Sequence, residues 1–447
     1  MSRYTINDLT QAMQAGKMTR RDAVARALEM GLSLSALGAL LQASDAIGEA
    51  ATVGPVTLEV WEQQVSINVV KLAVTAFLAK YPAIKVKWIP TPGADTATKL
   101  LAAISAGSGA PDIAFISYSD MAKFTSRDGA GLRDLRPYMA TTGQKLSDWI
   151  KWPMDLVTSK SGKILGIPAD IGAAGTFYRR DVFAAAKLPT QPAEVYGLIS
   201  TWDNFIAIGK KITATGRYML EDAATVFDIV RQQGSQGYFD ASGNPIVNNP
   251  EFVHAAEVAL RVRQAKLDGR IAGFSAESGA AMKAGKVATY FGAAWFDIII
   301  HGAAPETAGK WGTTVLPEKA SANFGGSYYT ISEQSKHPQE AWQLLSFVLS
   351  SKPGMAAYLH GLKFLPAWKQ AFTLPVFTSP DSFYKGQVWL QQFVKAADQV
   401  PVIRISPNDT IAADAVTHAV TDILLHGATI KSRLNQANGE IAQRTRS

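Results

Sequence analysis

Two hydrophobic periods alternate along the chain from residue 56 to residue 118. Val56, Leu58 and Val60 recur at every second position, which is the period of a half-buried strand. A run with apolar residues every three or four positions follows and predicts a helix. The pattern continues in this way and predicts strands at 56–61, 84–88 and 112–118 and helices at 67–81 and 100–107. This order is typical of an α/β layer with right-handed crossovers, so we expect a largely parallel sheet.

The stretch from residue 164 to residue 183 interrupts this regularity. Two short extended runs, at 164–167 and 176–178, flank a link that contains Pro168, Gly172 and Gly175. Proline cannot donate to a sheet ladder, and the two glycines predict backbone angles that other residues avoid. We interpret this link as a hinge between two lobes. An ordinary strand connection inside one domain is the alternative.

Helical patterns dominate after this link and indicate a second, helix-richer lobe. Thr201 and Asn249 stand where helix N-caps belong, and Pro250 occupies the first turn after Asn249. The predicted helices lie at 201–216, 223–233, 249–267, 338–349 and 412–441, and the predicted strands lie at 287–291, 311–317 and 324–331.

Length and composition narrow the class of protein. At 447 residues the chain exceeds the roughly 250–300 at which a single core stops growing, so two domains are expected. The net charge of +7 comes from scattered Lys and Arg, without the stripe typical of nucleic-acid binding. The chain has no cysteine, which excludes disulfides, thiolate metal sites and a cysteine nucleophile.

The first fifty residues have the features of an export signal. The pair Arg20 and Arg21 precedes an uncharged apolar run at 30–41, which is too short to span a bilayer. The segment resembles a twin-arginine leader, with cleavage expected after Ala46 or Ala50, and it predicts a periplasmic protein. An amphipathic N-terminal helix retained in a cytoplasmic protein is the alternative, and the export route stays open between the twin-arginine and general secretory systems.

A series of short motifs spans nearly all of the chain after this leader. Their order and spacing are more specific than any one of them, and they read Val60-Trp61, Ala-Pro-Asp-Ile at 110–113, Gly-Lys-Ile-Leu-Gly-Ile-Pro at 162–168, Phe-Tyr-Arg-Arg-Asp at 177–181, Gly-Ala-Ala-Trp at 292–295 and Gly-Gly-Ser at 325–327. In these residues the chain resembles the extracellular solute-binding proteins of ABC importers, family 1, the group that includes maltose-binding protein.

The resemblance implies an α/β protein of the type II periplasmic-binding-protein-like fold, with two lobes joined by a three-segment hinge and a ligand cleft between them. The chain would cross between lobes near 168–170, 291–293 and 327–329. The expected parts are an export signal at 1–50, an N-terminal lobe at 56–168 and 293–327, and a C-terminal lobe at 169–292 and 328–447.

The resemblance also implies a function. The protein would bind a mono- or oligosaccharide, or a related polyol, with high affinity and deliver it to the membrane permease of an ABC transporter. It would act as a monomer without cofactor, metal, catalytic residue or nucleic-acid partner. The implied ligand-binding residues are Trp61, Glu62, Gln63, Ser117, Tyr118, Asp120, Asp170, Trp295, Gly326 and Ser327.

Physical chemistry gives these residue types their roles. Trp61 and Trp295 would stack on the apolar face of a sugar ring, and Glu62, Asp120 and Asp170 would accept hydrogen bonds from its hydroxyl groups. Core packing is the alternative role for each tryptophan, and a cap or a solvated surface charge is the alternative for each carboxylate.

Three other functions compete with transport. Glu62, Asp120 and Asp170 are candidates for the carboxylate pair of a periplasmic glycosidase. Tyr328 and Tyr329 form an adjacent tyrosine pair, and such a pair ligates ferric ion in iron-binding relatives of this architecture. His418, Asp422 and His426 follow one helix face as metal ligands do, although an exposed amphipathic helix has the same pattern. A maltodextrin ligand in particular is not implied, because Gly172 replaces an expected acidic residue and no tryptophan lies near Ile411.

Overall fold

The computed structural model of the chain describes residues 55–64, 66–92, 95–129, 131–318, 321–361 and 363–446. The expected export signal lies outside these residues. Within the described ranges, no helix is both long enough and apolar enough to cross a membrane.

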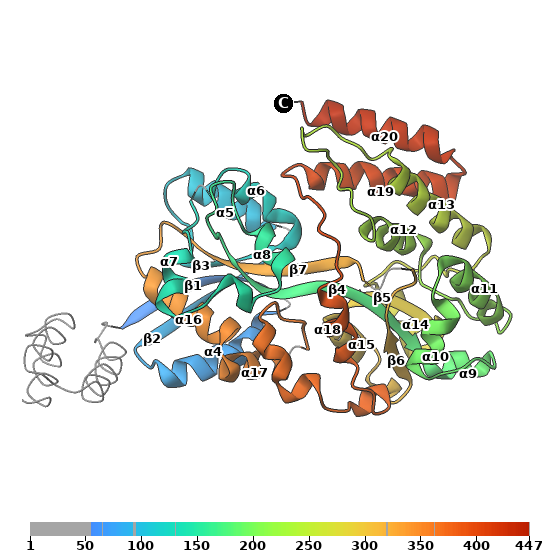
Figure 1. The fold of residues 1–447 in the computed structure, drawn as a ribbon, viewed down its shortest axis with the longest axis horizontal. Coiled ribbons are helices and arrows are strands. Elements are labelled where there is room, and N and C mark those ends of the chain that lie inside the picture. The colour runs from blue at the N-terminus through green and yellow to red at the C-terminus, as the bar shows by residue number, and fades with distance from the viewer. Residues whose placement is uncertain are drawn as a thin grey trace, which may run out of the picture. The chain divides into compact units, whose positions relative to one another are not determined.

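The first three predicted strands form one side of the sheet (Figure 1). The elements alternate as β1 (Val56–Gln63), α4 (Ile67–Lys80), β2 (Ile84–Thr91), α5 (Thr96–Ser105) and β3 (Ile113–Ser117). β1 and β3 are parallel, with Val60 opposite Ile113. β7 (Asn323–Ile331) then pairs antiparallel with β3, so the sheet is mixed where a largely parallel one was predicted. The difference arises because β7 comes from a distant part of the sequence.

β4 (Ile167–Arg179) connects two groups of strands, and all of its residues are buried. Its first part, up to Ala173, pairs antiparallel with β7. From Ala174 onward it pairs with β5 (Thr289–Ala293) and β6 (Trp311–Thr314), again antiparallel. The sequence predicted two short extended runs, at 164–167 and 176–178, with an irregular link between them. The structure instead has one continuous strand from Ile167 to Arg179. The change of partners falls between Ala173 and Ala174, beyond the predicted crossing at 168–170.

Gly172 is required by a close approach of two backbones. Neither Gly172 nor Gly175 has a positive φ, so the prediction of unusual backbone angles was wrong. A Cβ built on Gly172 would lie 2.5 Å from the carbonyl oxygen and 2.6 Å from the amide nitrogen of Gly325 on β7. The proline of the predicted hinge is accommodated by a shift in register between Pro168 and Asp170.

Helices cover the β1–β3 side of the sheet. α16 (Pro338–Ser350) and α17 (Lys352–Gly361) contact α4, and the rings of Phe77 and Phe347 lie 5.7 Å apart in this contact. Figure 1 shows α5 on the other face of these strands. The short elements that follow β3 are η2 (Tyr118–Asp120), α6 (Ala122–Thr125), α7 (Arg136–Thr141), η3 (Leu146–Asp148) and α8 (Lys151–Leu156).

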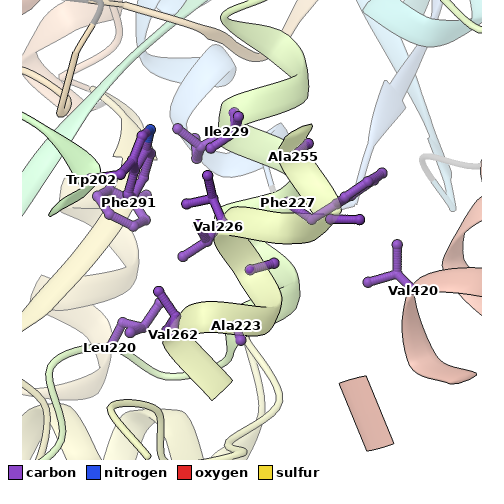
Figure 2. Packing of buried hydrophobic residues seen from close by; sticks show 14 of the residues in the cluster. Trp202, Leu220, Ala223, Val226, Phe227, Ile229, Ala255, Val262, Phe291 and Val420 are labelled. Atoms are coloured by element: carbon purple, nitrogen blue, oxygen red, sulfur yellow. The ribbon is translucent and has the colours of Figure 1, made fainter. Parts of the chain in front are cut away.

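A second core lies among the helices beyond β4 (Figure 2). Trp202 at the start of α11 packs edge-on against Phe291 of β5, with ring centroids 5.8 Å apart. The predicted caps are confirmed, since the side chain of Thr201 accepts from Asn204 N and that of Asn249 accepts from Phe252 N. The helices of this core are α10 (Pro192–Ile199), α11 (Trp202–Thr213), α12 (Ala223–Gln232), α13 (Pro250–Gln264), α19 (Asp409–His426) and α20 (Ile430–Arg444).

The remaining elements are short helical segments of nine residues or fewer. They are α9 (Arg180–Ala185), α14 (Ala276–Ala284), α15 (Phe296–Ala303), η4 (Pro305–Thr307), η5 (Lys369–Thr373), η6 (Pro375–Phe377), η7 (Ser382–Tyr384) and α18 (Leu390–Ala397).

Two contacts differ from the lobe boundaries expected from the sequence. β6 lies in the segment 293–327, which was expected in the N-terminal lobe, yet it pairs with β4 beside β5. α16 and α17 lie in the segment 328–447, which was expected in the C-terminal lobe, yet they contact α4. The boundaries themselves stay a prediction.

Candidate functional site

A cavity of about 820 Å³ lies beside the β4–β7 pair, next to the point where β4 changes partners. This volume is in the upper part of the roughly 300–1,000 Å³ range of ligand pockets. The lining residues are Gln63, Ser66, Phe115, Ser117, Tyr118, Ser119, Asp170, Arg231, Gln232, Gly237, Tyr238, Phe274, Trp295, Ile298, Ile299, Gly325, Gly326, Ser327, Tyr329, Tyr358, Phe364, Ile403, Ile405, Asp409, Thr410 and Ala413.

The carboxyl ends of two strands supply part of the wall. Gln63 is the last residue of β1, Ser117 is the last residue of β3, and Tyr118 follows directly. Because β1 and β3 are parallel, their ends meet at one edge of the sheet. Burial raises the pKa of the Tyr118 phenol to about 12, so this hydroxyl keeps its proton and can donate to a ligand.

Asp170 and Ser327 lie directly opposite each other on β4 and β7. The Ser327 hydroxyl donates a hydrogen bond to Oδ1 of Asp170, and both residues line the cavity. Burial raises the pKa of Asp170 to about 6, against the opposing effect of the Ser327 hydrogen bonds. At neutral pH this carboxylate is therefore an acceptor in the cavity wall.

Glu62 lies behind this wall. Its Oε2 accepts from the hydroxyl of Tyr329, and its Oε1 accepts from Gln63 N and from the Ser66 hydroxyl, both at 2.8 Å. Burial raises the pKa of Glu62 to about 7 in spite of these donors. Tyr329 itself lines the cavity, so Glu62 orients a lining side chain.

Three aromatic rings stack on one another at the cavity, and we call this group, which consists of Phe274, Trp295 and Phe324, the aromatic shelf. Phe274 and Trp295 line the cavity, and Phe324 on β7 packs against Trp295. The ring of Trp295 stacks on Phe274 at 6.1 Å and on Phe324 at 5.9 Å. Phe274 is 61% exposed and has a φ of 61°. An exposed phenylalanine in the left-handed region is unusual, and such residues cluster at ligand sites.

Arg231 and Asp409 form a charged corner of the same cavity. Arg231 is 6% exposed, and its guanidinium lies over the ring of Tyr238 at 4.6 Å. The Nε of Arg231 and the Oδ1 of Asp409 are buried without a hydrogen-bond partner among the described residues. Burial raises the pKa of Asp409 to about 7, and the charge of Arg231 opposes this rise.

Seven of the ten predicted site residues line the cavity, namely Gln63, Ser117, Tyr118, Asp170, Trp295, Gly326 and Ser327. Three do not. Trp61 and Glu62 are successive residues of β1, so their side chains point to opposite faces of the sheet. The indole N–H of Trp61 donates to the carboxylate of Glu59 at 3.1 Å. Asp120 is buried and forms an ion pair with Lys123 at 2.6 Å. Glu62 reaches the cavity only through Tyr329.

The residues of the competing functions are spread apart. Of Glu62, Asp120 and Asp170, only Asp170 lines the cavity, and of the two adjacent tyrosines only Tyr329 does. His426 pairs with Asp422 at 3.1 Å on α19, whereas His418 is oriented toward Asp414 at 3.9 Å. Within the described ranges, no group of three or more His, Cys, Asp or Glu side chains could hold a metal ion.

Sequence reasoning missed the most distinctive lining residues, which are Phe274, Arg231 and Asp409. Arg231 and Asp409 are separated by more than 170 positions in the chain and meet only because α12 packs against α19. Phe274 follows Gly273 in a loop, and no periodicity marks it. These positions are set by tertiary packing.

The fold and the cavity define a class of protein. A mixed α/β structure in which long strands run from one group of strands into another beside a cavity is the type II periplasmic-binding-protein fold. The chain belongs to the family of bacterial extracellular solute-binding proteins, whose sequence model matches residues 66–355. The resemblance drawn from the sequence motifs and the predicted fold class are thereby confirmed.

Two curated relatives are similar over most of their length. The chain is 28% identical to the lactose-binding protein of Rhizobium radiobacter over 388 residues, which are 83% of this chain and 89% of the relative. It is 27% identical to the arabinooligosaccharide-binding protein of Bacillus subtilis (strain 168) over 386 residues, which are 82% of this chain and 87% of the relative.

Solved structures share the fold. The sugar-binding protein MalE from the phytopathogen Xanthomonas citri superposes with a TM-score of 0.72 at 19% sequence identity. The match covers 87% of this chain and 98% of that protein.

Proposed function

We propose that this protein is the sugar-binding component of an ABC importer, which takes up an oligosaccharide in the cavity between its two lobes. The observation that carries the proposal is the cavity itself, which is lined both by Phe274 and Trp295 of the aromatic shelf and by hydrogen-bond donors and acceptors of β1, β3, β4 and β7. A pyranose or furanose ring has an apolar face for the shelf and a rim of hydroxyl groups for the polar wall.

The volume favours more than one sugar unit. About 820 Å³ is large for a monosaccharide, and two neighbouring rings of the shelf, Phe274 and Trp295, line the cavity. The relatives named for lactose and for arabinooligosaccharides support a di- or oligosaccharide of this kind. Trp295 would stack on a ring, while Asp170, Gln63, Ser117, Tyr118 and Ser327 would meet hydroxyl groups.

Closure of the lobes would make loading visible to the permease. The expected pivot is the stretch of β4 and β7 beside Gly172, where the two strands approach closely. Contacts made with both walls at once would favour the closed form, because a ligand with equal affinity for both forms shifts nothing. We place the protein in the periplasm, exported by the segment 1–50 and acting as a monomer that returns its ligand unchanged.

Isothermal titration of protein lacking residues 1–50 tests this function. The panel contains lactose, arabinobiose, arabinotriose, maltose and sorbitol, with solution scattering before and after each titration. We expect saturable heat and a smaller radius of gyration with at least one oligosaccharide, and chromatography should recover that oligosaccharide intact. A folded protein that binds none of them would contradict the proposal, and cleavage products would identify a glycoside-acting enzyme instead.

A further inference from the structure

The charged corner made by Arg231 and Asp409 has no counterpart in the predicted site. The side chain of Arg231 is 6% exposed, and its Nε is buried without a hydrogen-bond partner among the described residues. A buried charged group without partners is costly, so such groups mark places where a ligand supplies the missing bonds. Both residues line the cavity, and the free atoms belong to a donor, Nε, and an acceptor, Oδ1.

The position of the guanidinium limits which partner it can take. Its plane lies over Tyr238 at 4.6 Å, with Phe252 at 5.7 Å, so aromatic rings occupy its face. Only its N–H edges are left for hydrogen bonds. Two parallel N–H groups of a guanidinium match two neighbouring oxygen atoms, which are either those of a carboxylate or those of a vicinal diol.

The two unbonded atoms decide between these partners. A carboxylate could accept from the Nε of Arg231, but it has no hydrogen to donate to the Oδ1 of Asp409 and would place a second acceptor against it. An ammonium group could donate to the Oδ1 of Asp409, but it has no lone pair that could accept from Arg231. Asp170 adds a further acceptor to the cavity wall.

We propose that Arg231 and Asp409 form a subsite for a vicinal diol of an uncharged saccharide, and that the subsite excludes uronic acids and amino sugars. This deepens the proposed function and rests on it. Arg231 donates to two neighbouring hydroxyl oxygens, and one of these hydroxyls donates to Oδ1 of Asp409. A hydroxyl group is suited to this position because it can accept and donate at the same time.

Titrations at pH 7.5 with three kinds of probe test the subsite. Lactose and arabinotriose are the neutral probes, digalacturonic acid is the anionic probe, and the deacetylated glucosamine disaccharide is the cationic probe. We expect a neutral probe to bind at least about 100-fold more tightly than either charged probe. Tighter binding of digalacturonic acid or of the amino sugar would overturn the inference.

Two variants connect the selectivity to these residues. Arg231→Lys keeps the positive charge but removes the two parallel N–H groups of the guanidinium. It should weaken the binding of the neutral probes about 10-fold or more. Asp409→Asn removes the repulsion between the carboxylate of Asp409 and a carboxylate of the ligand. It should raise the affinity for digalacturonic acid, relative to that for the neutral probes, about 10-fold. Arg444→Lys on the surface of α20 is the control and should change nothing. Thermal unfolding verifies that each variant is folded.

The outcomes separate this inference from the proposed function. If neutral sugars bind and both variants match the wild type within twofold, the subsite is wrong while the sugar-binding function stands. If the folded wild-type protein binds no saccharide of any charge, the proposed function fails and this inference fails with it.

Discussion

The carboxylate of Asp170 on β4 accepts a hydrogen bond from the hydroxyl of Ser327 on β7 in the wall of the cavity. The pair joins two strands that the sequence separates by more than 150 residues, two positions away from the close approach of Gly172 to Gly325. It therefore connects ligand recognition with the proposed pivot, and its ionisation can be followed by experiment.

Sugar affinity should fall as the pH decreases through about 6. Burial raises the pKa of Asp170 to about 6, and once protonated its carboxyl group accepts hydroxyl hydrogens less well. We expect roughly 3- to 10-fold weaker binding of the best oligosaccharide of the panel at pH 5 than at pH 7.5, about 1 kcal/mol. Isothermal titration across this range provides the measurement.

Asp409 lines the same cavity and has a pKa of about 7, so it contributes to the same pH range. Asp170→Asn should remove the step near pH 6 and leave the one near pH 7, and the double variant with Asp409→Asn should be nearly flat. A double variant with the full wild-type pH dependence would show that neither carboxylate is responsible.

The stability of the fold should decrease as the pH rises from about 4.5 to about 7. Burial raises the pKa of Glu62 from 4.5 to about 7, so the folded state binds this proton more tightly than the unfolded state. The contribution is complete below pH 4.5 and is lost as the pH passes through 7. Its size is at most about 3.5 kcal/mol, from about 1.4 kcal/mol for each of the 2.5 pKa units.

Urea unfolding of Glu62→Gln against the wild type, at pH 4.5, 5.5 and 7.5, isolates this contribution. In Glu62→Gln, the free energy of unfolding should decrease much less between pH 4.5 and pH 7.5 than in the wild type. Glu59→Gln is the matched control on the same strand, because Glu59 is partly exposed beside Lys87. Equal slopes for all three proteins would rule out Glu62 as the source.

The two tryptophans expected to stack on sugar should differ in effect. Trp295 lies in the aromatic shelf, whereas Trp61 lies outside the cavity and donates to Glu59. Trp295→Ala should weaken oligosaccharide binding about 10- to 100-fold, as expected for loss of a central aromatic contact. Trp61→Ala should leave the affinity within twofold. The same titrations compare both, and a loss with Trp61→Ala alone would contradict the assignment.

Periodic segments could be read from the sequence because their signals are local. The helix α4, the caps Thr201 and Asn249, and the strand β3 all occur within a few residues of their predicted bounds. Their apolar spacing and cap chemistry need no distant partner.

Features that depend on distant partners could not be read in this way. β4 was divided at Pro168 and Gly172 because its hydrogen-bonding partners, β7 on one side and β5 with β6 on the other, come from much later in the chain. Trp61 and Glu62 are neighbours on β1, so the choice of sheet face decides their roles.

The approach of β4 to β7 leads to the last prediction, because Gly172 leaves no space for a side chain. A Cβ there would meet the backbone of Gly325 at 2.5 Å, and backbone cannot yield as a flexible side chain does. Gly172→Ala should therefore destabilise the fold by about 1–3 kcal/mol and displace the Gly325–Ser327 wall, which weakens sugar binding as well. Urea unfolding and titration measure the two effects.

Gly197→Ala in α10 is the matched control for this substitution. A Cβ there meets nothing within 4 Å, and alanine in an exposed helix interior should stabilise by about 0.5–1 kcal/mol. The same change of one methyl group thus has opposite signs at the two sites. If Gly172→Ala unfolds at the wild-type urea concentration, β4 and β7 have room to separate, and the close approach cannot be what fixes the proposed pivot.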